Sequence, residues 1–380
     1  MFCVSKKPKE IGGKMVERQR LILDCRQTNM LFRVPPVTHL GSLSALCEGH
    51  LQQDMDLFVG GGDIQDCFYA CHIPVEMQRF FCMKYDISVA DALDITGGVL
   101  PEELMHYPPS AKLCPTLCVL PMGFSWSFYL VQKLHESMTL RALGVSEDQL
   151  VVDGRPVPSF SKERCVGMPY CDNIHVLSGC PKVCEGGRNM IIEDLENIGF
   201  TVHEEVEASN IFPTLGGIID GKAGQVRPNP KRLWGLVYCF NYAAEHDVSS
   251  DFIRRLLGHA MCICVLCRPG MSVFRSLYDF SSRDLPKQKL WKSAARECRI
   301  LAGIIPLLIG DLRKPWATRL VCTDASPQGF GIAEKDVDEN QAAQLGQWNE
   351  RWHRDRALGL DVFNDIETAC RPTPEDENAH

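Results

Sequence analysis

The stretch Met168-Pro169-Tyr170-Cys171-Asp172-Asn173-Ile174-His175-Val176 sets two polar residues, Asp172 and Asn173, inside an apolar run of β-forming side chains. A carboxylate in such a run is costly unless it is paired or holds a metal ion. One interpretation is local, because Asp-Asn is favourable chemistry for the tight turn of a hairpin. The other interpretation makes Asp172 a ligand, and a ligand site of this kind needs a second acid.

A second acid stands in a similar setting about a hundred residues earlier, in Asp63-Ile64-Gln65-Asp66-Cys67-Phe68-Tyr69. If the two runs form neighbouring strands, Asp63 and Asp172 lie on one surface. That arrangement is typical of a two-metal site for phosphoryl transfer. We interpret Asp66, three residues further on, as a structural or solvent-facing residue.

The composition predicts a globular intracellular protein. A chain of 380 residues can form two to four domains or lobes, and 45% hydrophobic with 23% charged residues is an ordinary balance. No apolar run approaches the roughly 18 to 20 residues of a membrane span, and the N-terminus lacks the apolar segment of a signal peptide. We therefore expect a cytoplasmic or nuclear location, no membrane partner, and reduced, mostly buried cysteines.

The charge distribution bears on the class of partner. A net charge of −8 argues mildly against nucleic acid, but residues 334–380 carry twelve acidic and five basic side chains, so the rest is nearly neutral. Two basic clusters are either solvated surface or the walls of a groove for phosphates. Their members are Lys6, Lys7, Lys9, Lys14, Arg18, Arg20 and Arg26, then Lys287, Lys289, Lys292, Arg296 and Arg299.

Further local patterns place elements along the chain. The turn at 120–125 leads into a helix for which Ser125 is the predicted N-cap, and Gly123 can let the backbone approach a ligand closely. Hydrophobic periodicity and turn residues predict the rest. We expect a strand at 20–26, an irregular insertion at 84–116, a helix at 189–199 ending at a glycine, a hairpin at 215–221, mostly helix at 229–312, and a strand at 320–326.

Taken in order, six stretches resemble motifs of the retroelement reverse transcriptase family, of the retrotransposon type. Residues 2–7 with 20–29 resemble its fingers hairpin, 63–74 its first catalytic strand, and 120–125 the turn that contacts template and incoming nucleotide. Residues 170–173 resemble its catalytic hairpin and 215–217 its primer-grip region. Residues 323–326, with Gly329 and Gly331, resemble the first strand of an RNase H domain.

The resemblance implies an α+β chain with the right-hand architecture of a polymerase. Fingers, incomplete at the N-terminus, would cover 1–40 and 75–119, and a palm with an antiparallel sheet would cover 41–74 and 120–226. A mostly helical thumb or connection would follow at 227–314. Residues 315–380 would form a truncated RNase H-like α/β segment with an acidic tail.

The implied activity is that of an RNA-directed DNA polymerase, a nucleotidyltransferase that joins dNTPs to the 3′-hydroxyl of a primer on an RNA or DNA template. Asp63, Asp172 and Asn173 occupy the catalytic positions. Asp63 and Asp172 would hold two Mg²⁺ ions, with Mn²⁺ as an alternative. The nucleotide-binding positions are Lys6 and Arg20 for the triphosphate, Phe68 as the gate against a ribose 2′-hydroxyl, and Met122 with Gly123 beside the base pair.

Departures from the family pattern keep other functions open. Asn173 stands where the family has a second Asp, and a neutral oxygen attracts a metal less strongly. The alternative function is therefore a weakened or inactive relic, or a domesticated protein, that still binds nucleic acid. A polymerase that copies RNA into RNA is a third interpretation, against which Phe68 argues. The sequence leaves the oligomeric state open.

Only part of an RNase H site can be matched. Asp324 fits the first acid, and Glu367 is a candidate for the second. RNase H chemistry needs a larger set of carboxylates around two metal ions. We therefore expect this chain to have no RNase H activity.

Overall fold

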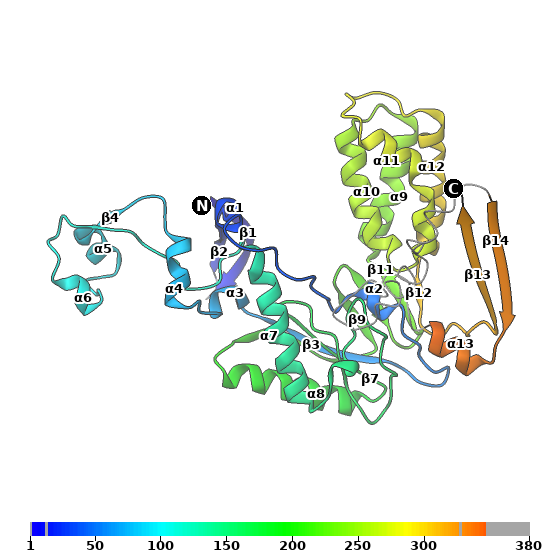
Figure 1. Cartoon of the computed structure of the whole chain (residues 1–380), viewed down its shortest axis with the longest axis horizontal. Coiled ribbons are helices and arrows are strands. Elements are labelled where there is room, and N and C mark those ends of the chain that lie inside the picture. Colours follow the sequence, from blue (N-terminus) through cyan, green and yellow to red (C-terminus); the bar gives the residue numbers. More distant parts are fainter. Residues whose placement is uncertain (1, 12–13, 327–328, 347–380) are drawn as a thin grey trace, which may run out of the picture. The chain divides into compact units, whose positions relative to one another are not determined.

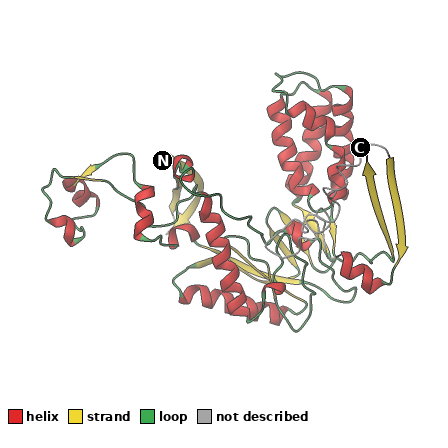
Figure 2. Cartoon of the chain, in the orientation of Figure 1, coloured by secondary structure: helices red, strands yellow, loops and turns green. Residues whose placement is uncertain are grey.

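The computed structural model describes residues 2–11, 14–326 and 329–346, which form a mixture of helices and antiparallel strand pairs (Figures 1 and 2). This agrees with the predicted α+β class. The chain divides into two compact units. The first comprises Met1–Thr38, Asp63–Met138 and Glu193–His203, and the second comprises His39–Gly62, Thr139–Ile192 and Glu204–His380.

The first unit begins with a hairpin of β1 (Phe2–Ile11) and β2 (Lys14–Ile22). The register pairs Phe2 with Ile22 and Ile11 with Lys14, with an irregularity between Lys6 and Lys9. The predicted strand at 20–26 therefore ends earlier than expected, at Ile22. Asp24 instead lies just before the short helix α1 (Arg26–Asn29), of which Arg26 is the first residue.

The stretch predicted to be irregular is more ordered than expected. It contains β4 (Ile87–Ser88) and β5 (Lys112–Leu113), which pair with each other around α5 (Val89–Ile95) and α6 (Glu102–Met105). A capping box between Ser88 and Asp91 starts α5. The prediction failed because these elements are too short for periodicity, and the strand pair joins residues far apart in sequence. The short elements α3 (Cys67–Ala70), α4 (Val75–Gln78) and a 3-10 turn (Arg79–Phe81) precede them.

One four-stranded sheet includes Asp63 and the strand that follows Asp172. Its strands have the order β6 (Val166–Gly167), β7 (Asn173–Ser178), β3 (Phe58–Ile64) and β8 (Val202–Ser209). Five of the six residues of β7 are buried. Position 61 of β3 requires glycine, because a Cβ atom there would collide with the carbonyl oxygen of Ile174. Two long helices, α7 (Ser125–Leu143) and α8 (Pro181–Asn197), precede and follow β6 and β7 in the sequence. α8 starts eight residues earlier than the helix predicted at 189–199, but it ends, as predicted, just before a glycine, Gly199, at φ 96°.

A second four-stranded sheet has the order β12 (Gly310–Asp311), β11 (Gln225–Pro228), β10 (Gly217–Asp220) and β9 (Ile211–Thr214). Thr214 pairs with Gly217, so Leu215 and Gly216 form a two-residue turn, with φ of 47° and 81°. The predicted hairpin exists, and residues 215–221 supply the first turn and β10 rather than a whole hairpin. Nearby, α2 (Leu43–Leu46) starts at Ser42, whose side chain accepts from the Ala45 amide.

Four helices of the second unit stand side by side (Figure 1). They are α9 (Pro230–Glu245), α10 (Ser250–Cys264), α11 (Arg275–Ser281) and α12 (Lys292–Ile304). Their apolar faces share one core, in which Phe240, Phe274 and Phe280 are almost fully buried. Among three closely spaced cysteines, Cys264 is buried in this core, Cys267 packs against it, and Cys262 is exposed.

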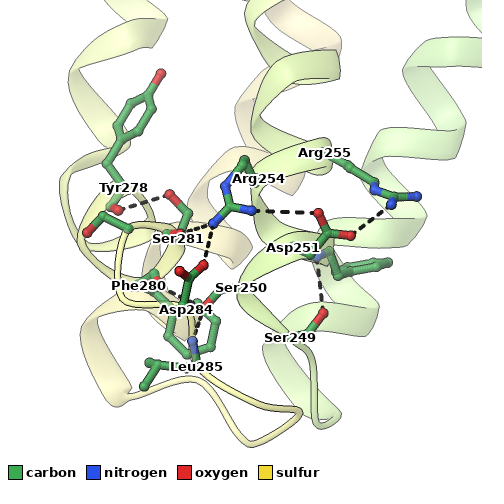
Figure 3. A network of polar contacts seen from close by, with 12 residues as sticks. Ser249, Ser250, Asp251, Arg254, Arg255, Tyr278, Phe280, Ser281, Asp284 and Leu285 are labelled. Carbon is green, nitrogen blue, oxygen red and sulfur yellow. Dashed lines mark hydrogen bonds and ion pairs between the residues drawn. The ribbon is translucent and has the colours of Figure 1, made fainter.

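Polar contacts fix the end of α11 to α10 (Figure 3). The Ser250 hydroxyl donates to the carbonyl oxygen of Phe280 over 3.0 Å and accepts from the Leu285 amide over 2.9 Å. The Arg254 guanidinium donates to the carbonyl oxygen of Ser281 at 2.9 Å and to the Asp284 carboxylate at 3.1 Å. The bond from Arg254 to Ser281 satisfies a carbonyl oxygen at the end of α11, where a helix leaves such groups without intrahelical partners.

The last part of the described chain is a hairpin of β13 (Arg319–Ser326) and β14 (Gly329–Asp336), followed by α13 (Glu339–Gly346). All residues of β14 are exposed. Short 3-10 turns elsewhere cover Glu147–Gln149, Arg268–Val273 and Ile305–Leu307. Across 2–11, 14–326 and 329–346, no helix combines the length and the apolar character that crossing a bilayer requires.

Candidate functional site

The hairpin before β7 has its tip at Cys171 and Asp172. Tyr170 and Asn173 exchange both backbone hydrogen bonds, Tyr170 N–H to Asn173 O at 3.1 Å and Asn173 N–H to Tyr170 O at 2.8 Å. The left-handed residue is Cys171, at φ 52°, and it is buried. Turn chemistry favours Gly, Asn or Asp in that conformation, not Cys. Asn173 is the first residue of β7, directly after the turn. Turn preference alone therefore does not account for the Asp-Asn pair.

Asp172 and Asn173 contact each other. The side-chain amide of Asn173 donates to Oδ1 of Asp172 over 3.0 Å, and both side chains are half-buried. A carboxylate offers about four lone-pair positions, so this bond occupies one that a cation could otherwise use.

Asp63 lies on β3, and β3 neighbours β7 in the sheet. Its partner is His203, a residue that the sequence did not single out. Nδ1 of His203 lies 3.0 Å from the carbonyl oxygen of Asp63, and Nε2 lies 3.5 Å from Oδ2 of the same residue. Both side chains are about one-third exposed, at 31% and 32%. No sequence signal reveals the pair, because the two residues are 140 positions apart.

Phe68 and Asp66 belong to the segment directly after Asp63. Asp66 is exposed and precedes α3 with φ 46°, and its carbonyl oxygen accepts from the amides of Tyr69 and Ala70. This agrees with the interpretation of Asp66 as a structural or solvent-facing residue. Phe68, on α3, is half-buried.

The turn containing Met122 and Gly123 is fixed by an earlier segment of the chain. Gly123 has φ 109°, and a Cβ atom there would lie 2.6 Å from the carbonyl oxygen of Leu23. Glycine is therefore required at this position by the chain itself, whether or not a ligand binds there. Met122 is half-buried beside it.

The predicted N-cap of α7 is wrong. Ser125 is the first helical residue, and its amide donates to Oδ1 of Asn29 over 2.9 Å. The cap therefore comes from a residue 96 positions earlier in the chain. Single-sequence rules look for a cap directly before the helix, so they could not find it.

Three of the remaining predicted positions lie on the β1–β2 and β13–β14 hairpins. The register of the first hairpin places Lys6 opposite Arg18 and Arg20 opposite Val4. Asp324 is exposed on β13, opposite Gly331. Glu367 lies outside the described residues.

Near the first hairpin, Asp24 and Arg26 form an exposed ion pair. Nε and Nη2 of Arg26 donate to the two carboxylate oxygens of Asp24 at 2.8 Å and 2.6 Å. These hydrogen bonds lower the pKa of Asp24 to about 2. Because both side chains are well exposed, the pair contributes little to stability on its own.

The carboxylate oxygens of Asp63 and Asp172 suit a hard cation such as Mg²⁺ better than a zinc ion. In the part of the chain that the structure describes, no group of three or more His, Cys, Asp or Glu side chains is arranged to hold a metal. Mg²⁺ does not need such a cage, because one or two carboxylates together with water and substrate phosphates usually hold it. The carboxylates of Asp63 and Asp172 match this requirement in ligand type.

The fold is reverse-transcriptase-like. The chain resembles the structure of a foamy viral protease-reverse transcriptase in complex with double-stranded DNA, at TM-score 0.51 and 13% identity, over 87% of this chain and 48% of the other. It also resembles a foamy viral protease-reverse transcriptase in complex with an RNA/DNA hybrid, at TM-score 0.50 and 15% identity, over 84% of this chain and 36% of the other. The chain thus spans less than half the length of these structures. No protein-family model and no curated protein matches it.

Proposed function

We propose that this chain is an RNA-directed DNA polymerase of the retrotransposon type, which transfers nucleotides from dNTPs to a primer 3′-hydroxyl. The observation that carries the proposal is the strand order. β3, which holds Asp63, is the neighbour of β7, which begins directly after Asp172. In a reverse-transcriptase-like fold, this order supports one shared site for the two acids, as two-metal phosphoryl transfer requires.

Asp63 and Asp172 would hold Mg²⁺, or Mn²⁺ in its place. When bound, the ions would favour the ionised primer hydroxyl and neutralise charge on the triphosphate. The chain's own residues would mainly orient the reactants, since positioning and electrostatics dominate this chemistry. Phe68 would exclude a ribose 2′-hydroxyl, Lys6 and Arg20 would hold the triphosphate, and Met122 and Gly123 would contact the nascent base pair.

We infer the same layout for the whole chain that the motifs suggest. Residues 1–40 and 75–119 act as fingers, 41–74 and 120–226 as palm, 227–314 as thumb or connection, and 315–380 as an RNase H-like segment without activity. The ligand is a primer–template. In support, the foamy viral structures of similar fold hold double-stranded DNA or an RNA/DNA hybrid.

Primer extension tests the proposal. Purified protein is incubated with a DNA primer on an RNA or a DNA template, dNTPs, and Mg²⁺ or Mn²⁺. We expect extension that is lost in Asp63→Asn and in Asp172→Asn. The control Asp54→Asn changes an exposed acid on another loop and should extend normally. Folded protein that extends no primer with either metal would overturn the polymerase proposal.

A second candidate function is nucleic-acid binding without synthesis. The hydrogen bond from the Asn173 amide to Asp172 favours it, because a neutral donor replaces a second carboxylate beside the metal position. Fluorescence anisotropy with a labelled primer–template distinguishes the two functions. Tight binding that Asp172→Ala leaves unchanged, combined with no extension, supports this candidate.

A further inference from the structure

A buried histidine lies three residues beyond Asp172. His175 is 3% exposed, and both of its ring nitrogens have polar partners. Nδ1 lies 3.0 Å from the carbonyl oxygen of Met168, and Nε2 lies 2.7 Å from the hydroxyl of Thr214. A carbonyl oxygen only accepts, so Nδ1 carries the hydrogen. In the neutral ring, Nε2 then accepts from the Thr214 hydroxyl.

The two partners of His175 belong to different hairpins. Met168 faces His175 across the hairpin that bears Asp172, and its amide donates to His175 O at 2.9 Å. Thr214 is the last residue of β9, directly before the turn into β10. Phe212, also on β9, meets the imidazole edge to face, with ring centroids 6.0 Å apart at 76°. His175 therefore connects the Asp172 hairpin to the β9–β10 hairpin.

Both hairpins have strained tips. Cys171 and Leu215 adopt φ of 52° and 47°, a conformation that non-glycine residues rarely keep. Such residues hold their conformation only where the surrounding structure determines it. The His175 ring has a polar contact with a residue of each hairpin, so it acts on both tips together.

We propose that His175 is a positioning residue, which through Thr214 fixes the Asp172 carboxylate relative to the β9–β10 turn. The proposal rests on the proposed function and on the resemblance of residues 215–217 to a primer-grip region. It deepens that function, because the His175–Thr214 hydrogen bond then sets the distance between the metal-binding acid and the primer end. A displacement of about 1 Å between reacting groups lowers the reaction rate by about a hundredfold.

A simpler role for His175 is core packing alone. Core packing predicts a loss of stability without a selective effect on the reaction step. Positioning predicts a slower reaction with unchanged binding. The two roles therefore differ in which measured quantity changes, and the substitutions can be chosen to separate them.

Four variants isolate the contact. In His175→Asn the amide nitrogen takes the place of Nδ1 and the bond to Thr214 is lost, whereas in His175→Gln the amide reaches the position of Nε2. Thr214→Val removes the hydroxyl at nearly constant shape, and Thr214→Ser retains it. Single-turnover extension of a DNA primer on an RNA template is measured for each variant, with thermal melting to establish folding.

We expect His175→Asn and Thr214→Val to lower the rate at saturating dNTP by about tenfold, since a partly displaced acid loses part of the hundredfold effect. The affinities for dNTP and for the primer–template should change less than about twofold, because His175 is buried and Thr214→Val keeps nearly the same side-chain shape. Thr214→Ser should approach the wild-type rate, and His175→Gln should lose less than His175→Asn. The double variant His175→Asn/Thr214→Val should be no slower than the slower single variant, because both remove the same bond.

Amide hydrogen exchange gives a readout that does not depend on catalysis. Thr214→Val should speed exchange in 168–175 as well as in 211–217, because the bond joins the two hairpins. Exchange in 168–175 that Thr214→Val leaves unchanged, or additive effects in the double variant, would overturn the coupling. Lower melting temperature with an unchanged rate would overturn the positioning role. If the wild type extends no primer, the proposed function fails, the positioning role fails with it, and exchange alone still decides the coupling.

Discussion

The side-chain amide of Asn29 donates a hydrogen bond to the backbone carbonyl oxygen of Gly123 over 3.0 Å. Its oxygen also accepts from the amide of Ser125, so one side chain fixes both the turn and the start of α7. The first amides of a helix have no partner within it, and a distant residue supplies one here.

Replacing Asn29 should therefore destabilise the first unit. We expect Asn29→Ala to lower the free energy of unfolding by about 1–2 kcal/mol, the usual cost of a lost helix cap. Asn29→Asp keeps the acceptor for Ser125 and loses the donor to Gly123, so its loss should be smaller. Urea unfolding followed by circular dichroism measures both. An alanine variant as stable as the wild type would contradict the capping role.

Substitution of Gly123 should be costly for a separate reason. Gly123→Ala introduces a side chain at φ 109° and places its Cβ 2.6 Å from the Leu23 carbonyl oxygen. We expect a loss of about 1–3 kcal/mol in the free energy of unfolding. Gly186→Ala is the matched control, because a Cβ at Gly186 in α8 would meet nothing within 4 Å beyond its own helix, and alanine favours helix. Equal effects of the two substitutions would refute the steric explanation.

Asn173→Asp should strengthen metal binding, because it replaces the amide that donates to Asp172 with a second carboxylate. We expect the Mg²⁺ concentration for half-maximal primer extension to fall by roughly tenfold, which corresponds to about 1.4 kcal/mol of added ligand interaction. A Mg²⁺ titration of the extension rate measures the effect. An unchanged midpoint would show that position 173 does not act on the metal.

Phe68→Ala should weaken the selection of deoxynucleotides. If Phe68 blocks a 2′-hydroxyl, its removal should lower the ratio of dNTP to rNTP incorporation by about 10 to 100-fold, the range for a steric pocket contact. Phe68→Tyr keeps the bulk and should keep the selection. The ratio of kcat/KM for each dNTP and its rNTP provides the measurement. The gate assignment fails if the alanine variant discriminates as the wild type does.

Arg26→Gln should raise the pKa of Asp24. The pKa of about 2 in the folded chain lies below the ordinary 3.8, so folding favours the ionised carboxylate. The stabilisation is complete above pH 3.8 and is lost as the pH falls toward 2. An NMR titration of the Asp24 carboxyl should show its pKa moving back toward 3.8 in the variant, and high salt should weaken the ion-pair part of the shift.

Asp91 is an internal control in the same titration. The hydroxyl and amide of Ser88 lower its pKa, and no arginine takes part. Arg26→Gln should therefore leave the pKa of Asp91 unchanged. If both carboxyl groups shift together, the variant has altered the fold rather than one ion pair.

Several features of the fold could be predicted from short sequence patterns. The helix that ends before Gly199 and the turn before β10 were predicted because glycine at positive φ and apolar periodicity are local signals. The helices and strand pair within 84–116 were missed, since each is too short to show a period. The contact between His203 and Asp63 could not be inferred at all, because nothing in the sequence joins residues 140 positions apart.

The residues alone were enough to show that the chain turns sharply near Asp172 and that Asp63 and Asp172 lie in strand-forming runs, since these properties depend on neighbouring residues. Contacts in the folded chain settled the rest. They put the strained residue of the turn at Cys171, made β3 the neighbour of β7, and joined His175 to Thr214. Strand order and side-chain partners depend on contacts between distant segments, which local backbone preference does not specify.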